Sequence, residues 1–411
     1  MIVPHGRECP ADTVGGTASV TVVIAPNRDL TVDAAKAIAI IAVVLGHVIQ
    51  GVAASGIIDG DSDAYAMANR FLYLFHMPVF AFLTALFVSR AVQRDGTARY
   101  LRSRVVTFLY LYVLWSLLQG AVRMLTGSLV NNPTSPLEVV QLWVPEGQLW
   151  FLPWLIVMTT AAVIVQPWRS RTRAVLALAA AGLVSLALWG IPFSYFGTQG
   201  LGLSVYFFAG TVWGAPRFTA RVQAVPTIVC WVAAVAGWAL VAALVIVTRA
   251  TPPTIEGASR TVESTAFGVV GSLAGVVAVI ATSRLLSRAG PASGWLAFVG
   301  TRTLEIFLAH IVATSGTRIV LSLAGVDDPA VHIVAGTIAG VGLPLLLWAV
   351  CTRARFPWLF AAPRALVGRP APRSESERLR AARLCRADPL RVRRRDPRAR
   401  GRAPVRRPWR G

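Results

Sequence analysis

Charged residues are scarce in this sequence, and lysine is almost absent from it. Only 14% of the 411 residues are charged, against roughly 25% in an ordinary soluble domain. Hydrophobic residues make up 55% of the chain, and its mean hydropathy is +0.60. Among 40 basic residues, 39 are arginine and one is lysine, Lys36. The composition argues against a soluble enzyme or a disordered chain and favours a polytopic membrane protein.

Cysteine is rare as well, and its distribution suggests no cross-link. Cys9, Cys230, Cys351 and Cys385 form no CxxC pair and no regular spacing, so neither a disulfide framework nor a metal site is indicated. A secretory signal is also missing, because the first apolar run is too short and follows no basic segment. Residues 1–27 are interpreted as a mobile polar tail.

Long apolar segments, in contrast, occupy most of the chain. A membrane-spanning helix needs about 20 mostly apolar residues. Ten segments fit this description: 34–52, 71–89, 105–125, 148–166, 174–190, 200–215, 225–248, 265–282, 301–323 and 331–352. The sequence therefore predicts an all-α membrane protein with about ten transmembrane helices.

Arginine is concentrated in every second loop between these segments. The loops after the second, fourth, sixth and eighth segments are basic, and the other loops are acidic, mixed or uncharged. Basic loops favour the cytoplasmic side of a membrane. We therefore expect a multi-pass protein of the plasma membrane with both termini in the cytoplasm.

The C-terminal tail, residues 353–411, is rich in arginine and proline. From Pro363 onward it contains 17 arginines and four acidic residues, so +13 of the net charge of +21 lies there. Such a composition cannot build a core and predicts disorder. We expect the tail to lie on anionic lipid headgroups. A nucleic-acid partner is not expected, because from Pro363 onward Trp409 is the only aromatic residue among the arginines.

Ionisable side chains inside a membrane segment are costly and mark functional sites by default. Lys36 and His47 lie in the first segment, eleven positions apart. Eleven residues make about three helical turns, which places both side chains on one face, about 16 Å apart along the axis. Lys36 is either a boundary residue that reaches the headgroups or a functional ammonium. The use of arginine everywhere else favours the second interpretation. Asp33, one turn earlier, is placed to pair with Lys36.

His76 lies in the second segment at about the same depth as His47. Two histidines at matching depth on consecutive helices favour a shared site over two separate packing residues. Pro78 follows two positions later and should leave the carbonyl group of Leu74 without its helical partner.

Two further segments carry candidates. His310 and Thr303 are seven positions apart in the ninth segment and share a face, whereas Glu305 points away from His310 and is within reach of Arg302. Trp150 lies in an aromatic motif at the start of the fourth segment. Aromatic residues at this depth are either interfacial anchors or part of a site.

Four motifs follow one another along the chain: Arg28, Asp33, Lys36 and Gly46-His47; Phe75-His76-Met77-Pro78; Leu149-Trp150-Phe151-Leu152; and Gly300 with Thr303-Leu304-Glu305-Ile306-Phe307-Leu308-Ala309-His310. On a frame of ten segments they resemble the acyltransferase 3 family of integral membrane O-acyltransferases, and most of all its fucose 4-O-acetylase-like branch. The resemblance covers the predicted membrane domain, residues 28–352. The chain departs from the family pattern at Thr84-Ala85, where relatives often have a Ser-Gly pair.

The resemblance implies an acetyl-CoA-dependent O-acetyltransferase. Acetyl-CoA or another acyl-CoA would be a donor substrate rather than a permanently bound cofactor. The acceptor would be a hydroxyl group on a sugar, a glycan, or a glycosylated lipid or metabolite, as in the modification of cell-envelope carbohydrate. The main alternative is a secondary transporter or a flippase for lipid-linked glycans, and a sensor without catalytic activity is a third. Transporters commonly contain inverted repeats, and no convincing internal repeat is present.

The resemblance also suggests residue roles. His47 is expected to be the general base that takes the proton of the acceptor hydroxyl, because an imidazole titrates near neutral pH. Lys36 is expected to hold the donor phosphates or to orient the thioester. The remaining candidates are Arg102 and Arg104 as further phosphate ligands, His76 and His310 as catalytic groups of the cavity, and Asp33, Trp150, Thr303 and Glu305 as supporting residues.

Overall fold

The computed structural model describes residues 30–191, 193–254, 260–288 and 290–367, and in this part of the chain it contains helices and loops but no strands. The predicted N-terminal tail, Arg28 and residues 368–411 of the predicted C-terminal tail lie outside the described residues. The prediction of an all-α fold is confirmed.

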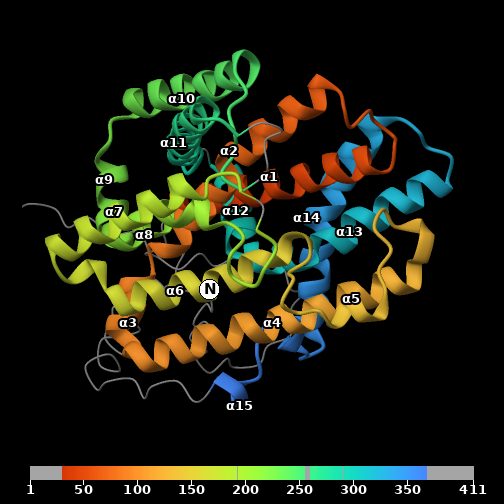
Figure 1. Cartoon of the computed structure of the whole chain (residues 1–411), viewed down its shortest axis with the longest axis horizontal. Helices are drawn as coiled ribbons and strands as arrows, with labels where there is room; N and C mark the ends of the chain where they lie inside the picture. The colour runs from red at the N-terminus through yellow and green to blue at the C-terminus, as the bar shows by residue number, and fades with distance from the viewer. Residues whose placement is uncertain (1–29, 192, 255–259, 289, 368–411) are drawn as a thin grey trace, which may run out of the picture. The chain divides into compact units, whose positions relative to one another are not determined.

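Within the described ranges, eight helical segments are long and apolar enough to cross a membrane. Figure 1 shows α10 and α11 side by side, α4 and α6 side by side, and α1 and α2 between these two pairs. The eight segments are α1 (Leu30–Ala54), α2 (Asp63–Ala85) with α3 (Val88–Asp95), α4 (Thr97–Thr126), η2 (Gly147–Trp150) with α6 (Phe151–Val165), α10 (Thr227–Val247), α11 (Val262–Leu286), α13 (Thr303–Leu323) and α14 (Pro329–Arg353).

The other two predicted spans are shorter helices. α7 (Arg171–Ala187) is about 25 Å long, and α8 (Ser204–Trp213) about 15 Å, which is half the thickness of a hydrocarbon core. α8 ends because Gly214 adopts a positive φ of 66°, and the basic helix α9 (Ala215–Ala224) follows. Gly210 lets α8 pack directly on the backbone of α2 at Phe82. α8 is therefore held inside the protein instead of reaching across a bilayer by its own length.

The ninth predicted span, 301–323, corresponds to α13, and a separate helix, α12 (Pro291–Thr301), precedes it. α12 and α13 are separated at Arg302, whose φ of −113° and ψ of 22° lie outside the α-helical region. Shorter helical turns connect the long helices elsewhere: η1 (Gly127–Leu129), α5 (Pro136–Val140), η3 (Pro167–Arg169), η4 (Leu201–Leu203), η5 (Pro357–Leu359) and α15 (Arg364–Val367).

Pro78 lies inside α2, and its consequence for the backbone is visible. A proline has no N–H to donate to the carbonyl group four residues earlier. The hydroxyl of Ser272 in α11 donates to that carbonyl group, on Leu74, at 2.6 Å. The predicted free carbonyl is thus satisfied by another helix, and the hydrogen bond holds α11 against α2 next to His76.

Replacing Ser272 by alanine is expected to lower the free energy of unfolding by about 1–2 kcal/mol, because the Leu74 carbonyl then stays buried without a partner. The temperature of half-unfolding in detergent measures this change. Ser283→Ala is the matched control, since Ser283 is buried in the same helix but donates to the Val279 carbonyl of its own helix. Equal losses in both variants would contradict the role assigned to Ser272.

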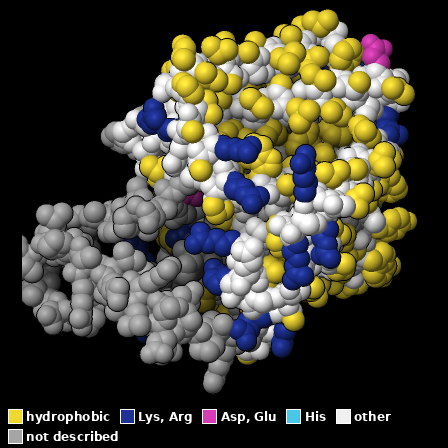
Figure 2. All heavy atoms as spheres, turned by 90° about the vertical axis from the view of Figure 1, so that its left-hand side faces the viewer, with side chains coloured by type: hydrophobic (Ala, Val, Ile, Leu, Met, Phe, Trp, Pro, Cys, Tyr) yellow, Lys and Arg dark blue, Asp and Glu magenta, His cyan; other side chains and the backbone are white. Residues whose placement is uncertain are grey.

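Basic side chains gather at one end of the helix bundle. Figure 2 shows this face, where lysine and arginine side chains outnumber acidic ones. The arginine-rich end is formed by α3, α9 and the first turns of α4 and α7, whose arginines are Arg90, Arg94, Arg99, Arg102, Arg104, Arg171, Arg173, Arg217 and Arg221. The loop between α1 and α2, which contains Asp59 and Asp61, lies at the opposite end of α2 from α3. The arginines of loops that are far apart in the sequence therefore lie together at one end of the bundle.

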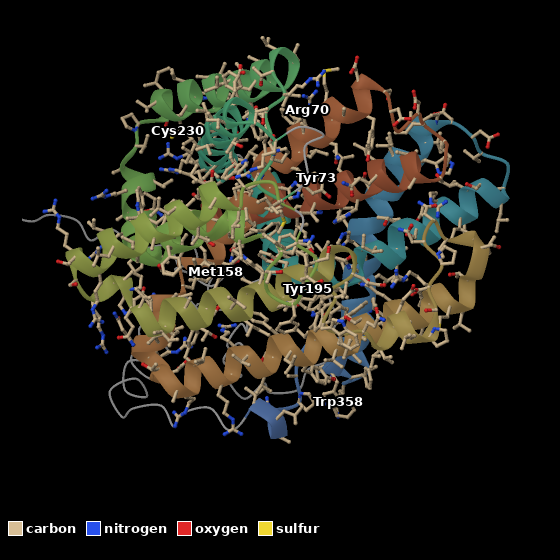
Figure 3. The ribbon with its side chains drawn as sticks, in the orientation of Figure 1. Arg70, Tyr73, Met158, Tyr195, Cys230 and Trp358 are labelled. Atoms are coloured by element: carbon tan, nitrogen blue, oxygen red, sulfur yellow. The ribbon has the colours of Figure 1, made fainter. Side chains whose placement is uncertain are left out.

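Beyond α14 the chain packs along α4. The hydroxyl of Tyr110 donates to the carbonyl of Trp358 at 3.0 Å, and the indole N–H of Trp115 donates to the carbonyl of Leu359 at 2.9 Å. Figure 3 labels Trp358 at this edge of the bundle. The part of the predicted tail up to Val367 therefore has a defined structure on the surface of α4.

Candidate active site

Lys36 and His47 both belong to α1, which is enclosed by other helices. α2, α11, α12, α13 and α14 all pack on it. Lys36 and Asp33 are each only 4% exposed, whereas His47 is half-buried. Because α1 is continuous from Leu30 to Ala54, the two side chains keep the predicted axial separation of about 16 Å.

Three histidines from three helices meet in the middle of the bundle, and they are called the histidine cluster here: His47, His76 and His310. The rings of His47 in α1 and His310 in α13 are 5.2 Å apart between centroids. Tyr73 in α2 joins the third member, with its ring 6.4 Å from His47 and 4.4 Å from His76. The matching depth predicted for His47 and His76 thus becomes a shared site, and α13 adds His310 to it.

The backbone sets the orientation of two of these imidazoles. Nδ1 of His76 donates to the carbonyl of Leu72 at 2.7 Å, and Nδ1 of His310 donates to the carbonyls of Ile306 and Phe307 at 3.1 and 2.9 Å. In the neutral form Nε2 of each ring is then an acceptor. Nε2 of His310 is buried and has no hydrogen-bond partner among the described residues. Both rings therefore present an acceptor atom, and that of His310 is available to a substrate.

A hydrogen-bonded chain of neutral side chains continues from the cluster. The hydroxyl of Tyr73 donates to Oε1 of Gln50 at 3.1 Å, and Nε2 of Gln50 donates to Oδ1 of Asn69 at 3.1 Å. Gln50 lies one turn after His47 on the same face of α1 and interacts with its imidazole. Figure 3 shows Tyr73 near the centre of the bundle. Polar groups therefore extend from His47 away from the arginine-rich end.

Lys36 lies near the arginine-rich end. Its ammonium is 4.8 Å from the ring centroid of Phe87, at the junction of α2 and α3. Arg104 stacks on Tyr100 at the start of α4, with its guanidinium carbon 5.4 Å from the ring centroid, while Arg102 is exposed. The two arginines are thus on the same end of the molecule as Lys36, in the helix that packs on α3.

The break between α12 and α13 holds a second group of charges. The guanidinium of Arg302 lies 3.8 Å from the ring centroid of Trp348 and 3.6 Å from Oε1 of Glu305. Glu305 thus pairs with Arg302, as its spacing predicts, and points away from the histidine cluster. Thr303, the first residue of α13, is half-buried and two turns before His310.

Trp150 is a buried residue. Its ring lies over Gly200 and makes an edge contact with Phe151 at 5.7 Å. Phe151 in turn contacts Phe307 of α13, with centroids 5.8 Å apart. The predicted aromatic motif is therefore packed against the helix that carries His310.

The loop between α4 and α6 closes over this region. α5 begins with a capping box, in which a hydrogen bond from the backbone N–H of Ser135 lowers the pKa of the Glu138 carboxyl group below its usual value. Nδ2 of Asn131 donates to the carbonyl of Gly51, one turn beyond His47, at 2.9 Å. The loop is thereby fixed to the end of α1 that lies away from the arginines.

Sequence reasoning missed three polar residues beside the cluster, Gln50, Asn69 and Tyr73, and a fourth, Gln148, which is buried in η2. Gln50 and Tyr73 lie one turn from His47 and His76, so a search for polar side chains at i±3 of each histidine finds both. The described residues contain no group of three or more His, Cys, Asp or Glu side chains placed to hold a metal ion. The imidazoles of the cluster can transfer protons and form hydrogen bonds.

Comparisons with known proteins found a matching family and two relatives. A family model described as an acyltransferase domain matches residues 29–349, which is most of the chain. Nodulation protein NolL of Sinorhizobium fredii is 36% identical over 93 residues, or 22% of this chain and 24% of that protein. Nodulation protein NolL of Mesorhizobium japonicum is 29% identical over 136 residues, or 31% of this chain and 33% of that protein. The matched region thus spans a third or less of either relative. No solved structure matches the chain significantly.

Proposed function

We propose that this chain transfers an acetyl group from acetyl-CoA to a hydroxyl group of a sugar, a glycan or a glycosylated lipid. The proposal proceeds from the family: the chain belongs to the acyltransferase family whose model matches residues 29–349. The observation that carries this proposal is the histidine cluster, built by α1, α2 and α13 inside the matched region. Acyl transfer to a hydroxyl group needs a base that takes its proton, and an imidazole is suited to this role.

His47 is the member of the cluster that we assign as the base. It is half-buried, whereas His76 and His310 are buried, so it is the easiest of the three for a substrate to reach. It takes the proton of the acceptor hydroxyl while that oxygen attacks the carbonyl carbon of the thioester. The tetrahedral intermediate then expels the CoA thiolate, which takes the proton from the imidazolium. His76 and His310 accept hydrogen bonds at Nε2 and orient the acceptor.

The donor approaches from the arginine-rich end, which we place on the cytoplasmic side of the plasma membrane. Lys36 binds phosphate groups of acetyl-CoA there, and Arg102 and Arg104 provide further positive charge. The axial distance of about 16 Å between Lys36 and His47 is one that the extended pantetheine arm of CoA can span. We expect the arginines of the C-terminal tail to bind anionic headgroups on the cytoplasmic side.

The acceptor approaches from the opposite end. The polar side chains of Gln50 and Asn69 lead from His47 in that direction, and uncharged polar groups of this kind bind the hydroxyl groups of carbohydrates. Donor and acceptor thus meet at the histidine cluster from opposite sides.

Membranes that contain the protein are expected to transfer label from radiolabelled acetyl-CoA to their glycan or glycolipid fraction. A transporter or flippase moves its substrate without consuming acetyl-CoA. Mass spectrometry of the fraction identifies the acetylated product. No transfer above that of membranes lacking the protein, with the chain present at normal levels, would contradict the proposal.

Replacing Lys36 by methionine is expected to raise the KM for acetyl-CoA about 10- to 100-fold, the size of a lost charge-assisted hydrogen bond. The wild type is expected to use acetyl-CoA better than acetyl-pantetheine, which lacks the phosphate groups of CoA. The Lys36→Met variant should lose this preference. Lys36→Arg keeps the charge and should change KM less. A variant that retains the preference would contradict phosphate binding by Lys36.

A further inference from the structure

Gln148 is the most unusual polar residue of the bundle outside the histidine cluster. Its side chain is 3% exposed. Neither its amide nitrogen nor its amide oxygen has a hydrogen-bond partner within the part of the chain that the structure describes. A buried amide without a partner costs free energy of folding, so its presence calls for a compensating ligand.

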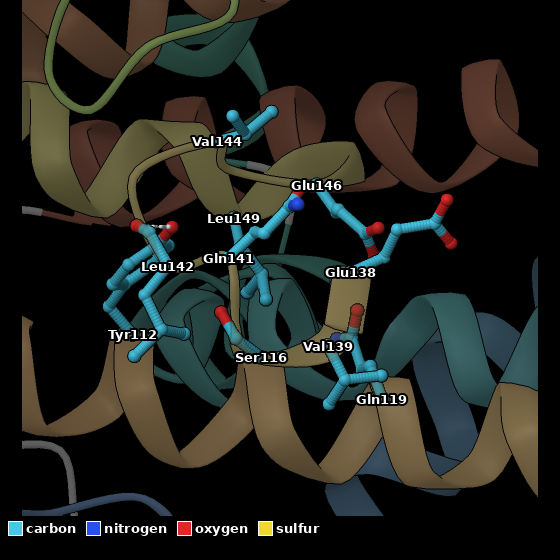
Figure 4. A pocket seen from close by; sticks show the side chains of 10 residues that line it. All are labelled: Tyr112, Ser116, Gln119, Glu138, Val139, Gln141, Leu142, Val144, Glu146 and Leu149. Carbon is cyan, nitrogen blue, oxygen red and sulfur yellow. Dashed lines mark hydrogen bonds between the residues drawn. The ribbon is translucent and has the colours of Figure 1, made fainter. Parts of the chain in front are cut away.

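The local helix geometry defines where Gln148 is directed. Residues 147–150 form the 3₁₀ helix η2, in which successive side chains point in three directions and residues three apart eclipse one another. Figure 4 shows Leu149 directed toward α4, beside Ser116 and Gln119. Trp150 lies over Gly200. Ideal 3₁₀ geometry gives Gln148 the third direction, which a residue three positions later, Phe151 at the start of α6, shares.

Phe151 faces the helix that carries His310. Its ring contacts Phe307 at 5.8 Å, and Phe307 lies 6.3 Å from the His310 ring. Nε2 of Gln119 donates to the carbonyl of Leu308 at 3.0 Å and fixes α13 against α4. The Phe151–Phe307 contact thus joins the helix that follows Gln148 to the turn of α13 that carries His310.

One buried group on η2 and one on α13 lack a hydrogen-bond partner within the described ranges. Nε2 of His310 and the amide of Gln148 are both without a partner among the described residues. A substrate that reaches both groups would satisfy them. Nε2 of His310 can only accept in the neutral form, so a donor must come from another residue. Two buried donors of η2 and α6 have no partner among the described residues, the amide of Gln148 and the indole N–H of Trp154. The ring of Trp154 packs against Phe207 of α8, and we take the amide of Gln148 as the donor.

We propose that the Gln148 amide donates a hydrogen bond to the carbonyl oxygen of the acyl group during transfer. The proposal rests on the proposed acyltransferase function. When the acceptor oxygen attacks the thioester carbon, the carbonyl double bond opens and its electron pair moves to oxygen. The negative charge is then stabilised by the amide N–H until the C–S bond breaks and the carbonyl re-forms. Donors placed at such an oxyanion act most strongly where water is excluded.

The test uses the full-length chain in lipid nanodiscs, with radiolabelled acetyl-CoA and the glycolipid extract of producing membranes as acceptor. Gln148→Met keeps length and flexibility and removes both polar atoms. Its kcat is expected to fall about 10²-fold or more, with the KM for acetyl-CoA within threefold of the wild type. The temperature of half-unfolding should be unchanged or higher, because no intramolecular hydrogen bond is lost. Gln148→Glu keeps an acceptor but has no N–H donor, and the kcat of its ionised form, measured at alkaline pH, should be as impaired as that of Gln148→Met.

Gln141→Met is the matched control. Gln141 lies in the same loop but lines the crevice that faces α4 (Figure 4), so its kcat is expected to stay within twofold of the wild type. Wild-type kcat in Gln148→Met would overturn the inference, and wild-type kcat in Gln148→Glu would overturn the donor assignment. If neither Gln148 variant folds, the amide has a structural role and the inference is also overturned. A wild-type protein that transfers no acetyl group contradicts the proposed function instead.

Discussion

Replacing His47 by glutamine is expected to lower the kcat for acetyl transfer about 10²- to 10⁴-fold, which corresponds to about 3–5 kcal/mol of activation free energy. Glutamine fills similar space and forms hydrogen bonds, but it cannot take a proton at neutral pH. The side chain of His47 is half-buried, so the variant should fold with little change in stability. Transfer of label from acetyl-CoA and the temperature of half-unfolding, measured on the same preparation, separate these two effects.

His332→Gln is the matched control for this variant. His332 is buried in α14, outside the histidine cluster, and its Nε2 donates to the carbonyl of Val326 at 2.7 Å. A glutamine amide can make the same donation, so kcat is expected to stay within about twofold of the wild type. Activity that survives in His47→Gln but is lost in His310→Gln would contradict the assignment of His47 as the base.

Replacing Gly300 by alanine is expected to lower the free energy of unfolding by about 1–3 kcal/mol, the usual cost of an added methyl group in a packed core. A Cβ atom at this position would collide with the backbone carbonyl of Asp33. Backbone atoms cannot rotate away, so α12 must move from α1 one turn before Lys36. We therefore also expect a higher KM for acetyl-CoA. The temperature of half-unfolding and the KM are the two measurements.

Gly294→Ala controls for the effect of alanine in the same helix. Gly294 lies in α12 as well, and a Cβ atom there has no neighbour within 4 Å. Alanine favours a helix over glycine by about 1 kcal/mol, so this variant should be as stable as the wild type or more stable. If Gly300→Ala and Gly294→Ala behave alike, the close approach of α12 to α1 does not limit stability.

Local features of the sequence predicted much of the architecture. Apolar length predicted the positions of the helices, since a membrane segment needs a defined number of apolar residues whatever its neighbours are. The family prediction from the four motifs is confirmed by the match over residues 29–349. The lengths of α7 and α8 were harder to predict. The apolar run near residues 200–215 continues through both ends of α8, and only the packing of Gly210 on Phe82 shows that the helix is held inside the bundle.

Pro78 shows what the sequence of a single helix can predict and what it cannot. Chain geometry alone predicts that the carbonyl of Leu74 loses its helical partner. The group that replaces this partner, Ser272, comes from a helix far along the chain. A missing donor is a property of one helix, whereas its replacement depends on which helices become neighbours.

Some features of the candidate site follow from the sequence of one helix, and others depend on how the helices pack. Spacing alone places Lys36 and His47 on one face of one helix, because the rise and turn of an α-helix are constant. The contact of His47 with His310, and the chain from Tyr73 through Gln50 to Asn69, depend on the packing of separate helices. Gln148 shows the limit most clearly: a glutamine in an aromatic motif has no special meaning until the surrounding helices are in place. Only the packed structure shows that its amide is buried and has no hydrogen-bond partner among the described residues.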